Sequence, residues 1–193
     1  MIIFIVPKNS GLAICKDISK EYSGEILEVR GEDVPLFVAE LLSQNKKVIG
    51  ITGEDLFKEF SLKNKEKNLE IVKRIVWDDE KCIFEKPTLC LMGSKNKKLE
   101  SLPKKIRVCI NRKYQKLTNK YCINGLISRG YEVEKIYVSG CSEEMFSEGL
   151  VDLVVDIVYS GKSAEEAGLG VYEKIFSSDI IVIGCKEVIE NGK

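Results

Sequence analysis

The strongest chemical signal in the chain is the stretch 151–163, Val-Asp-Leu-Val-Val-Asp-Ile-Val-Tyr-Ser-Gly-Lys-Ser. Its apolar first half predicts a buried strand, its small residues predict a tight turn, and a helix is expected to open just beyond it. This arrangement directs free backbone N–H groups and the positive end of the helix at an anion. A phosphate group is the natural ligand. Its contacts would come from Ser160, Gly161, Lys162 and Ser163.

The residues around this turn indicate which kind of phosphate it binds. A nucleotide P-loop requires a glycine five residues before Gly161, where the chain has Asp156, so the P-loop interpretation fails. A carboxylate there suits a phosphoribosyl site, in which the turn takes the 5-phosphate and Asp156 faces ribose hydroxyls or a metal on a diphosphate. Asp152 lies four residues earlier on the same face of the strand and is expected to join it. The alternative is a helix capped by Ser163 and Glu166 that binds no ligand.

The composition excludes several kinds of catalytic site. The 193 residues include no histidine, and 30 Lys and Arg balance 30 Asp and Glu. A Ser-His-Asp or Cys-His triad, an imidazole general base and a histidine metal ligand are therefore excluded. The balanced charge argues against a nucleic-acid partner. Residues 95–116 nevertheless carry nine Lys or Arg and one Glu, which indicates either a solvated connection or a basic wall facing a polyanionic small molecule.

Short apolar runs alternate with helical stretches, a pattern that predicts an α/β fold. Strands are expected at 2–6, 25–29, 48–51, 89–92, 107–110, 132–138, 153–158 and 180–183. Helices are expected at 11–22, 34–44, 54–60, 116–129, 142–148 and 164–174. A polar stretch at 93–98 predicts a linker between two lobes. The first lobe would comprise residues 1–93 plus about 176–193, to which the last strand returns, and the second lobe 94–175.

The cysteines and the apolar segments indicate the cellular compartment of the protein. None of the seven cysteines forms a CxxC pair, and the apolar run at the start of the chain is too short for a signal or membrane helix. We therefore expect a cytoplasmic protein with reduced thiols and no membrane segment. Most of the cysteines stand among apolar residues and are expected in the core, whereas Cys141 is expected to be exposed.

Six short motifs follow one another along nearly the whole chain. They are Pro7-Lys8; Arg30 with Asp33-Val34-Pro35; Gly50-Ile51-Thr52-Gly53-Glu54-Asp55; Arg107-Val108 with Lys113-Tyr114; Val138-Ser139-Gly140-Cys141-Ser142-Glu143; and the stretch from Gly149 to Leu169 that holds the phosphate turn. In this order they resemble the motifs of the ATP phosphoribosyltransferases of histidine biosynthesis. Each motif alone is weak, but six in the family's order are specific.

The resemblance implies a two-lobed fold of the type II periplasmic-binding-protein kind, with mixed, mostly parallel sheets and helices on both faces. It implies condensation of ATP with phosphoribosyl diphosphate to N1-(5-phosphoribosyl)-ATP and diphosphate, with magnesium (Mg2+) carried mainly on the substrate diphosphate. The chain is similar to the family's short form, whose catalytic subunit joins a histidyl-tRNA-synthetase-like regulatory subunit in a hetero-oligomer; a homo-oligomer is the other expectation. The alternative function is a two-lobed relative that binds phosphosugars or other anions without transfer.

The same resemblance suggests roles for particular residues. Asp156 and Glu143 are the candidate catalytic carboxylates, with first-turn helix charge as the alternative for Glu143. The candidate phosphoribosyl diphosphate contacts are Asp152, Asp156, Ser160, Gly161, Lys162 and Ser163. The candidate nucleotide or diphosphate contacts are Lys8, Arg30, Gly53, Asp55 and Lys113. For the basic residues the alternative is solvent exposure, for Asp55 it is helix capping, and for Gly53 it is a simple tight turn.

Overall fold

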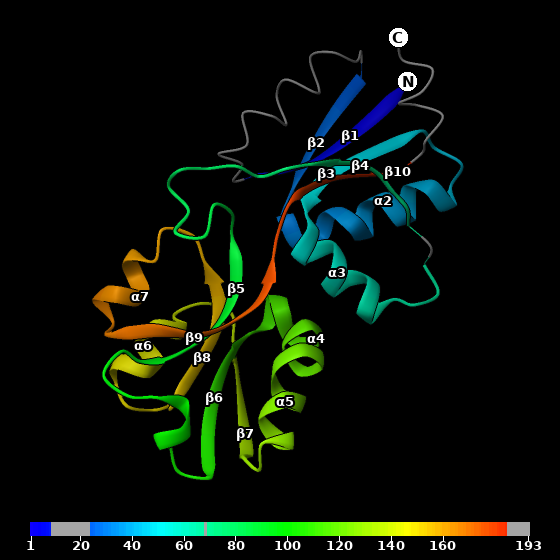
Figure 1. Cartoon of the computed structure of the whole chain (residues 1–193). Helices are drawn as coiled ribbons and strands as arrows, with labels where there is room; N and C mark the ends of the chain where they lie inside the picture. The colour runs from blue at the N-terminus through cyan, green and yellow to red at the C-terminus, as the bar shows by residue number, and fades with distance from the viewer. Residues whose placement is uncertain (9–23, 68, 185–193) are drawn as a thin grey trace. The chain divides into compact units, whose positions relative to one another are not determined.

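The computed structural model describes residues 1–8, 24–67 and 69–184. The chain divides into two compact units (Figure 1): unit 1 is Met1–Val76 with the C-terminal residues from Asp179, and unit 2 is Trp77–Ser178. The boundary predicted near residue 93 is wrong, because β5 (Thr88–Ser94) is an inner strand of the sheet in unit 2. The predicted linker is the end of this strand and the turn that follows it.

In unit 1 the described strands form a sheet in the order β2-β1-β3-β10-β4. β1 pairs in parallel with β2 and β3, and β10 pairs antiparallel with β3 and β4. The predicted return of the last strand to the first lobe is confirmed. β4 was not predicted, because Lys73 and Arg74 interrupt its apolar residues. The bounds are β1 (Ile2–Pro7), β2 (Gly24–Val29), β3 (Val48–Gly53), β4 (Ile71–Ile75) and β10 (Ile180–Gly184).

In the described part of unit 1, α2 and α3 pack against this sheet and contribute to its core. A 3-10 turn, Gly31–Asp33, leads into α2 (Val34–Ser43), where Pro35 suits the first helical turn because its missing N–H has no helical partner there. Val34 and Val38 of α2 pack with Ile5 of β1 and Ile183 of β10, and all four are fully buried. α3 (Glu54–Lys63) adds Phe57 to the same cluster.

In unit 2 the described strands form a sheet in the order β7-β6-β8-β5-β9. β6 pairs in parallel with β7 and β8, while β5 pairs antiparallel with β8 and β9. Each described sheet thus has as many antiparallel as parallel pairings. The expectation of mixed sheets is confirmed, but its detail that parallel pairings predominate is wrong. The remaining bounds are β6 (Lys105–Asn111), β7 (Glu132–Val138), β8 (Leu153–Val158) and β9 (Leu169–Ser177).

Helices cover both faces of this second sheet, as predicted (Figure 1). On one face, α6 (Ser142–Ser147) and α7 (Lys162–Glu166) pack over a cluster that includes Met92, Cys109 and Val154. On the other face lies a continuous helical segment that contributes buried Leu117 and Leu126. It consists of a 3-10 turn (Arg112–Tyr114), α4 (Gln115–Thr118), a π-helical turn (Asn119–Ile123) and α5 (Asn124–Ser128). A further 3-10 turn spans Leu99–Ser101.

The helix predicted at 164–174 is wrong in its second half. α7 ends at Glu166, Gly168 follows with φ +76°, and the chain continues as β9. The β-branched and aromatic side chains of β9 favour a strand once β5 is available as a partner. The helix expected at 11–22 lies outside the described residues. Among the residues that the structure describes, no helix is both long and apolar enough to cross a membrane.

Candidate functional site

The carboxyl ends of three neighbouring strands of unit 2, β7, β6 and β8, meet at one edge of the sheet. The parallel register pairs Ile110 with Val155, so the next residues along, Asn111 and Asp156, are neighbours. Asn111 Nδ2 lies 3.1 Å from each carboxylate oxygen of Asp156. Ligands of open α/β sheets bind at the carboxyl ends of the strands, which makes this edge the candidate site.

Asp156 accepts hydrogen bonds from three residues. Besides the Asn111 amide, the Ile157 N–H donates to Oδ1 over 2.8 Å, and the Ser142 hydroxyl lies 2.5 Å from Oδ2. Burial raises the pKa of this carboxyl above its ordinary value, while the three donors act in the opposite direction. Because its partners fix both oxygens, the carboxylate is held in place before any ligand arrives.

Ser142 connects Asp156 to a second carboxylate, that of Glu143. Ser142 begins α6 with its side chain fully buried, and its Oγ lies 3.0 Å from Glu143 Oε2. Glu143 Oε1 accepts a hydrogen bond of 3.0 Å from the hydroxyl of Ser163. We call Asp156, Ser142 and Glu143 the carboxylate cluster. It joins β8 to α6, and through Ser163 it reaches the phosphate turn.

The phosphate turn, residues 160–163, follows β8 directly. Gly161 has φ +73°, in the left-handed region that glycine adopts without steric cost. The Glu165 N–H donates to the Gly161 carbonyl over 2.9 Å, which closes the first turn of α7. Gly161 is the N-cap residue of α7, and Ser163 lies inside the helix with its hydroxyl bonded to Glu143, so Ser163 is not the N-cap that the alternative required. Lys162 and Ser163 are exposed, as phosphate contacts must be.

Two further predicted residues of unit 2 have different positions. Lys113 lies just past β6, exposed, with its N–H bonded to Asn111 Oδ1 over 3.1 Å, so it shares the edge with the carboxylate cluster. Asp152 lies at the start of β8, where its Oδ2 accepts a 2.7 Å bond from the Arg107 N–H. At about 3.3 Å per residue, it is roughly 13 Å along the strand from Asp156. The structure therefore does not bring Asp152 to the phosphate turn.

The predicted nucleotide-side residues of unit 1 gather at the carboxyl edge of its own parallel strands. Lys8 follows β1, Arg30 follows β2, and Gly53 ends β3. The Lys8 N–H donates to the Val29 carbonyl over 2.7 Å, and the side chains of Lys8 and Arg30 are exposed. Asp55 is only 6% exposed in the first turn of α3, the position of a helix-stabilising carboxylate.

Sequence reasoning missed two members of the site. Asn111 is 9% exposed and orients Asp156, and Ser142 is fully buried between two carboxylates. A signal for Asn111 exists: it is the first polar residue after the apolar run 108–110, at the carboxyl end of a strand. Ser142 stands inside one of the six motifs, but only the fold shows that its hydroxyl faces Asp156.

The donor set of the site can be compared with the needs of a metal. Within the described ranges, no group of three or more Asp, Glu, Cys or His side chains is placed to hold a metal ion. The carboxylate cluster offers two carboxylates, those of Asp156 and Glu143. Mg2+ is usually bound through one or two carboxylates together with substrate phosphates. The cluster therefore fits a metal carried on a diphosphate, and it does not fit a metal held by protein side chains alone.

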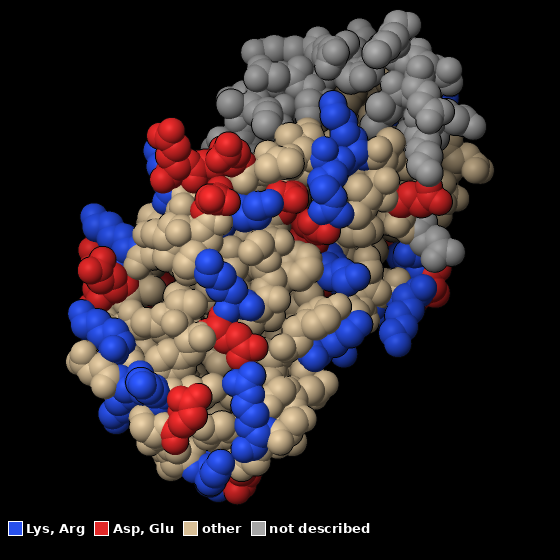
Figure 2. All heavy atoms as spheres, in the orientation of Figure 1, with Lys and Arg blue, Asp and Glu red and all other residues tan. Residues whose placement is uncertain are grey.

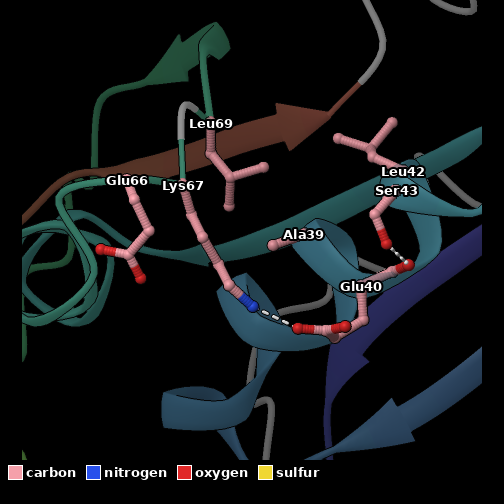
Figure 3. A pocket seen from close by; sticks show the side chains of 7 residues that line it. All are labelled: Ala39, Glu40, Leu42, Ser43, Glu66, Lys67 and Leu69. Carbon is pink, nitrogen blue, oxygen red and sulfur yellow. Dashed lines mark hydrogen bonds and ion pairs between the residues drawn. The ribbon is translucent and has the colours of Figure 1, made fainter.

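A separate pocket of about 550 Å³ lies in unit 1 beside α2 (Figure 3). Leu42 and Leu69 line it, and the ammonium of Lys67 forms an ion pair with Glu40 across it. Glu66 adds a second carboxylate, so the lining is acidic overall. None of the predicted site residues lines this pocket. The net negative charge of this lining opposes the binding of a nucleoside triphosphate.

The face shown in Figure 2 carries side chains of both charges. On the face shown in Figure 2, Lys and Arg side chains are interspersed with Asp and Glu. A nucleic-acid footprint requires basic side chains gathered along one stripe or patch. The balanced total of 30 basic and 30 acidic residues is consistent with this view.

Comparison with known proteins gives a consistent result. A family model described as ATP phosphoribosyltransferase matches residues 30–192. The ATP phosphoribosyltransferase of Bacillus cereus (strain AH820) is 30% identical over 186 residues, which cover 96% of this chain and 77% of that protein. The enzyme of the same name from Caldicellulosiruptor saccharolyticus is 33% identical over 170 residues, with 83% of this chain and 72% of that protein covered.

Solved structures show the same fold. The ATP phosphoribosyl transferase (HisG:HisZ) complex from Thermotoga maritima matches with a TM-score of 0.70 at 22% identity, covering 98% of this chain and 90% of that chain. The periplasmic aliphatic sulphonate binding protein SsuA from Escherichia coli matches with a TM-score of 0.62 at 13% identity, covering 98% of this chain and 63% of that chain. The prediction of a fold of the type II periplasmic-binding-protein kind is confirmed.

Proposed function

Because the chain belongs to the ATP phosphoribosyltransferase family, we propose that its carboxylate cluster and phosphate turn bind phosphoribosyl diphosphate. The chain is a pentosyltransferase that condenses ATP with phosphoribosyl diphosphate to N1-(5-phosphoribosyl)-ATP and diphosphate, the first step of histidine biosynthesis. The observation that carries the site assignment is the series of contacts from Asp156 through Ser142 and Glu143 to Ser163.

The two carboxylates take different parts in this proposal. Asp156 accepts the Asn111 amide, the Ile157 N–H and, over the shorter contact, the single Ser142 proton, so both of its oxygens are engaged. Glu143 accepts the Ser163 hydroxyl at Oε1 and has Ser142 Oγ 3.0 Å from Oε2. A carboxylate has about four lone-pair directions, so Glu143 retains more capacity to accept ribose hydroxyls. Asp156 holds Ser142 and, with it, Glu143 in place. The amides and hydroxyls of the phosphate turn take the 5-phosphate.

Transfer at the anomeric carbon needs no imidazole. The reaction builds positive charge on the sugar ring and negative charge on the departing diphosphate, so the main tasks are orientation and charge stabilisation. Two carboxylates near the ribose stabilise the ring charge. On the nucleotide side, in unit 1, Lys8 and Arg30 supply cations for diphosphate or triphosphate oxygens, Gly53 allows close backbone approach, and Asp55 stabilises the start of α3. In unit 2, Lys113 supplies a cation for diphosphate oxygens.

Enzymes of this family need a metal. We assign this requirement to Mg2+, held mainly by the substrate diphosphate, with Glu143 as the protein carboxylate that retains capacity to bind it. Such an ion would offset the charge of the leaving diphosphate. The position of the Glu143 carboxylate beside the phosphate turn supports this assignment, since Mg2+ is usually bound through one or two carboxylates together with substrate phosphates.

A partner subunit is part of the proposal. The solved Thermotoga maritima complex pairs HisG with HisZ, and this chain shares its fold with that structure over 98% of its length. We propose that the present chain likewise assembles with a histidyl-tRNA-synthetase-like regulatory subunit, in the cytoplasm. Co-expression followed by size-exclusion chromatography tests the assembly, and two separate peaks would contradict it.

The activity is tested by mixing the purified chain with ATP, phosphoribosyl diphosphate and Mg2+, with and without the regulatory subunit. Phosphoribosyl-ATP should appear, as followed by its ultraviolet absorbance. Binding of phosphoribosyl diphosphate without product under either condition would favour the alternative, a phosphosugar-binding relative that does not catalyse transfer.

The site assignment is tested with a matched pair of variants in α6. Glu143→Gln should lower the affinity for phosphoribosyl diphosphate, while Glu144→Gln, an exposed neighbour on the same helix, should leave it unchanged. Asp152→Ala should reduce stability through the lost Arg107 contact without changing this affinity. Equal affinities for wild type and Glu143→Gln, measured by calorimetry, would remove Glu143 from the site.

A further inference from the structure

A loop of unit 2, residues 77–85, packs against the phosphate turn. The N–H of Ile83 donates to the carbonyl of Tyr159, the residue before the turn, over 3.0 Å. The hydroxyl of Tyr159 donates to Oδ2 of Asp79. The Ile83 side chain lies over Gly161, where an added Cβ would stand 3.0 Å from Ile83 Cδ1. One backbone bond, one side-chain bond and one packing contact therefore tie the loop to the turn.

The 77–85 loop is itself well fixed. Backbone bonds of 3.0 Å and 2.8 Å run from the Asp79 N–H to the Glu85 carbonyl and from the Cys82 N–H to the Asp79 carbonyl. Phe84 packs against the core cluster of unit 2, and the Lys174 ammonium lies 3.7 Å from the centre of its ring. The loop thus connects the phosphate turn to the core by a second route, independent of β8 and α7.

Within this loop, the Asp79 carboxylate accepts hydrogen bonds both from the loop and from Tyr159. Its Oδ1 accepts the Lys81 N–H over 2.9 Å, and its Oδ2 accepts the Tyr159 hydroxyl. The same bond raises the pKa of Tyr159 to about 12 and lowers that of Asp79. The Tyr159 ring also meets Trp77 edge-on, with ring centroids 6.5 Å apart. The loop therefore engages Tyr159 by its carbonyl, its hydroxyl and its ring.

We propose that Asp79 is a positioning residue for the phosphate turn and acts through Tyr159. The proposal rests on the proposed phosphoribosyl diphosphate site and adds to it a residue far away in the sequence. A glycine-containing turn loses more conformational freedom on binding than a turn that is already held in its bound shape. By fixing Tyr159, Asp79 reduces that loss and strengthens binding of the 5-phosphate without touching it.

The test uses the full chain, with its partner subunit if activity requires it, and the variants Asp79→Ala, Asp79→Asn and Tyr159→Phe. A hydrogen bond of this kind corresponds to about a three- to tenfold change in affinity. Asp79→Ala and Tyr159→Phe should each raise the Kd and KM for phosphoribosyl diphosphate by this factor, with kcat and the KM for ATP nearly unchanged. The double variant should be no weaker than the weaker single variant. Asp79→Asn retains an acceptor and should fall between wild type and Asp79→Ala.

Trp77 is the single tryptophan of the chain and reports directly on this contact. Titration of wild type with phosphoribosyl diphosphate, which does not absorb at the excitation wavelength, should change the Trp77 emission, and the change should be smaller in Tyr159→Phe. The matched control is Asp78→Asn, which removes the same charge from an exposed neighbour and should match wild type.

The outcomes separate this proposal from the one on which it rests. If wild type binds phosphoribosyl diphosphate and both Asp79→Ala and Tyr159→Phe bind it equally well, the positioning role of Asp79 is refuted and the site assignment stands. If wild type does not bind phosphoribosyl diphosphate at all, the site assignment fails, and the positioning role fails with it. Tyr159→Phe retains the ring and its packing, so this arm remains decisive even if Asp79→Ala folds poorly.

Discussion

Gly161→Ala is the substitution that best tests how the phosphate turn works. Gly161 combines φ +73° with close packing: an added Cβ would stand 3.0 Å from Ile83 Cδ1 and 3.6 Å from Ile83 Cγ2. The substitution therefore introduces backbone strain and a crowded contact at the centre of the turn. Ile83 is 52% exposed, so its side-chain end can move by the few tenths of an ångström required.

The expected magnitude follows from these two effects. A left-handed conformation costs a non-glycine residue about 1–2 kcal/mol. The Ile83 contact adds little because the side chain is flexible at its exposed end. We expect the free energy of unfolding to fall by about 1–2 kcal/mol. If the turn instead relaxes into another shape, the same energy appears as a roughly tenfold loss in affinity for phosphoribosyl diphosphate.

Two other glycines of unit 2 provide matched controls. Gly149 has φ +68° with nothing within 4 Å of an added Cβ, so Gly149→Ala should cost similar stability without changing ligand affinity. Gly125 lies in α5 with open space and no positive φ, so Gly125→Ala should stabilise by about 0.5–1 kcal/mol. Urea denaturation and calorimetry measure both quantities. Gly161→Ala that changes neither the free energy of unfolding nor the affinity for phosphoribosyl diphosphate, or Gly149→Ala that loses affinity, would refute the reasoning.

Three further predictions concern the core, the thiols and pH. Leu91→Ala should destabilise by about 2–5 kcal/mol because Leu91 is fully buried, whereas Leu150→Ala, at 46% exposure, should change the unfolding free energy by less than about 0.5 kcal/mol in urea denaturation. Among the described cysteines, exposed Cys141 should react with a thiol reagent first, since burial raises the pKa of Cys90 to about 12; mass spectrometry that finds Cys90 labelled as fast would contradict this. Because burial raises the pKa of Asp156 above its ordinary 3.8, its stabilising contribution is present below pH 3.8 and is lost as pH rises through the raised pKa. Urea denaturation at a series of pH values from below 3.8 to above the raised pKa should show the unfolding free energy of wild type falling relative to that of Asp156→Asn. If the two unfolding free energies change in parallel with pH, the prediction is contradicted.

The sequence by itself determined the fold class and indicated the site that we propose. Strands of a sheet that is covered on both faces tend to be continuous apolar runs, so β1, β3, β8 and β10 could be predicted from the sequence. The phosphate turn is equally local, because its strand end, left-handed Gly161 and serines are adjacent in the chain. For the same reason the position of Asp156, four residues before the turn on the strand that leads into it, was predictable.

The tertiary structure decided whatever depends on residues far apart in the sequence. The segment 169–177 is a strand because it pairs with β5. This pairing depends on residues distant in the sequence, so the local periodicity of the segment does not predict it. Asp152 and Asp156 were expected to act together, but the strand separates them, and the parallel register places Asn111 beside Asp156 instead. Asp79 and Tyr159 meet across 80 positions of sequence because the 77–85 loop returns to the end of β8. Strand pairing and loop packing bring such distant residues together. Both depend on the free energy of the whole folded unit, so they cannot be predicted from any short stretch of the sequence.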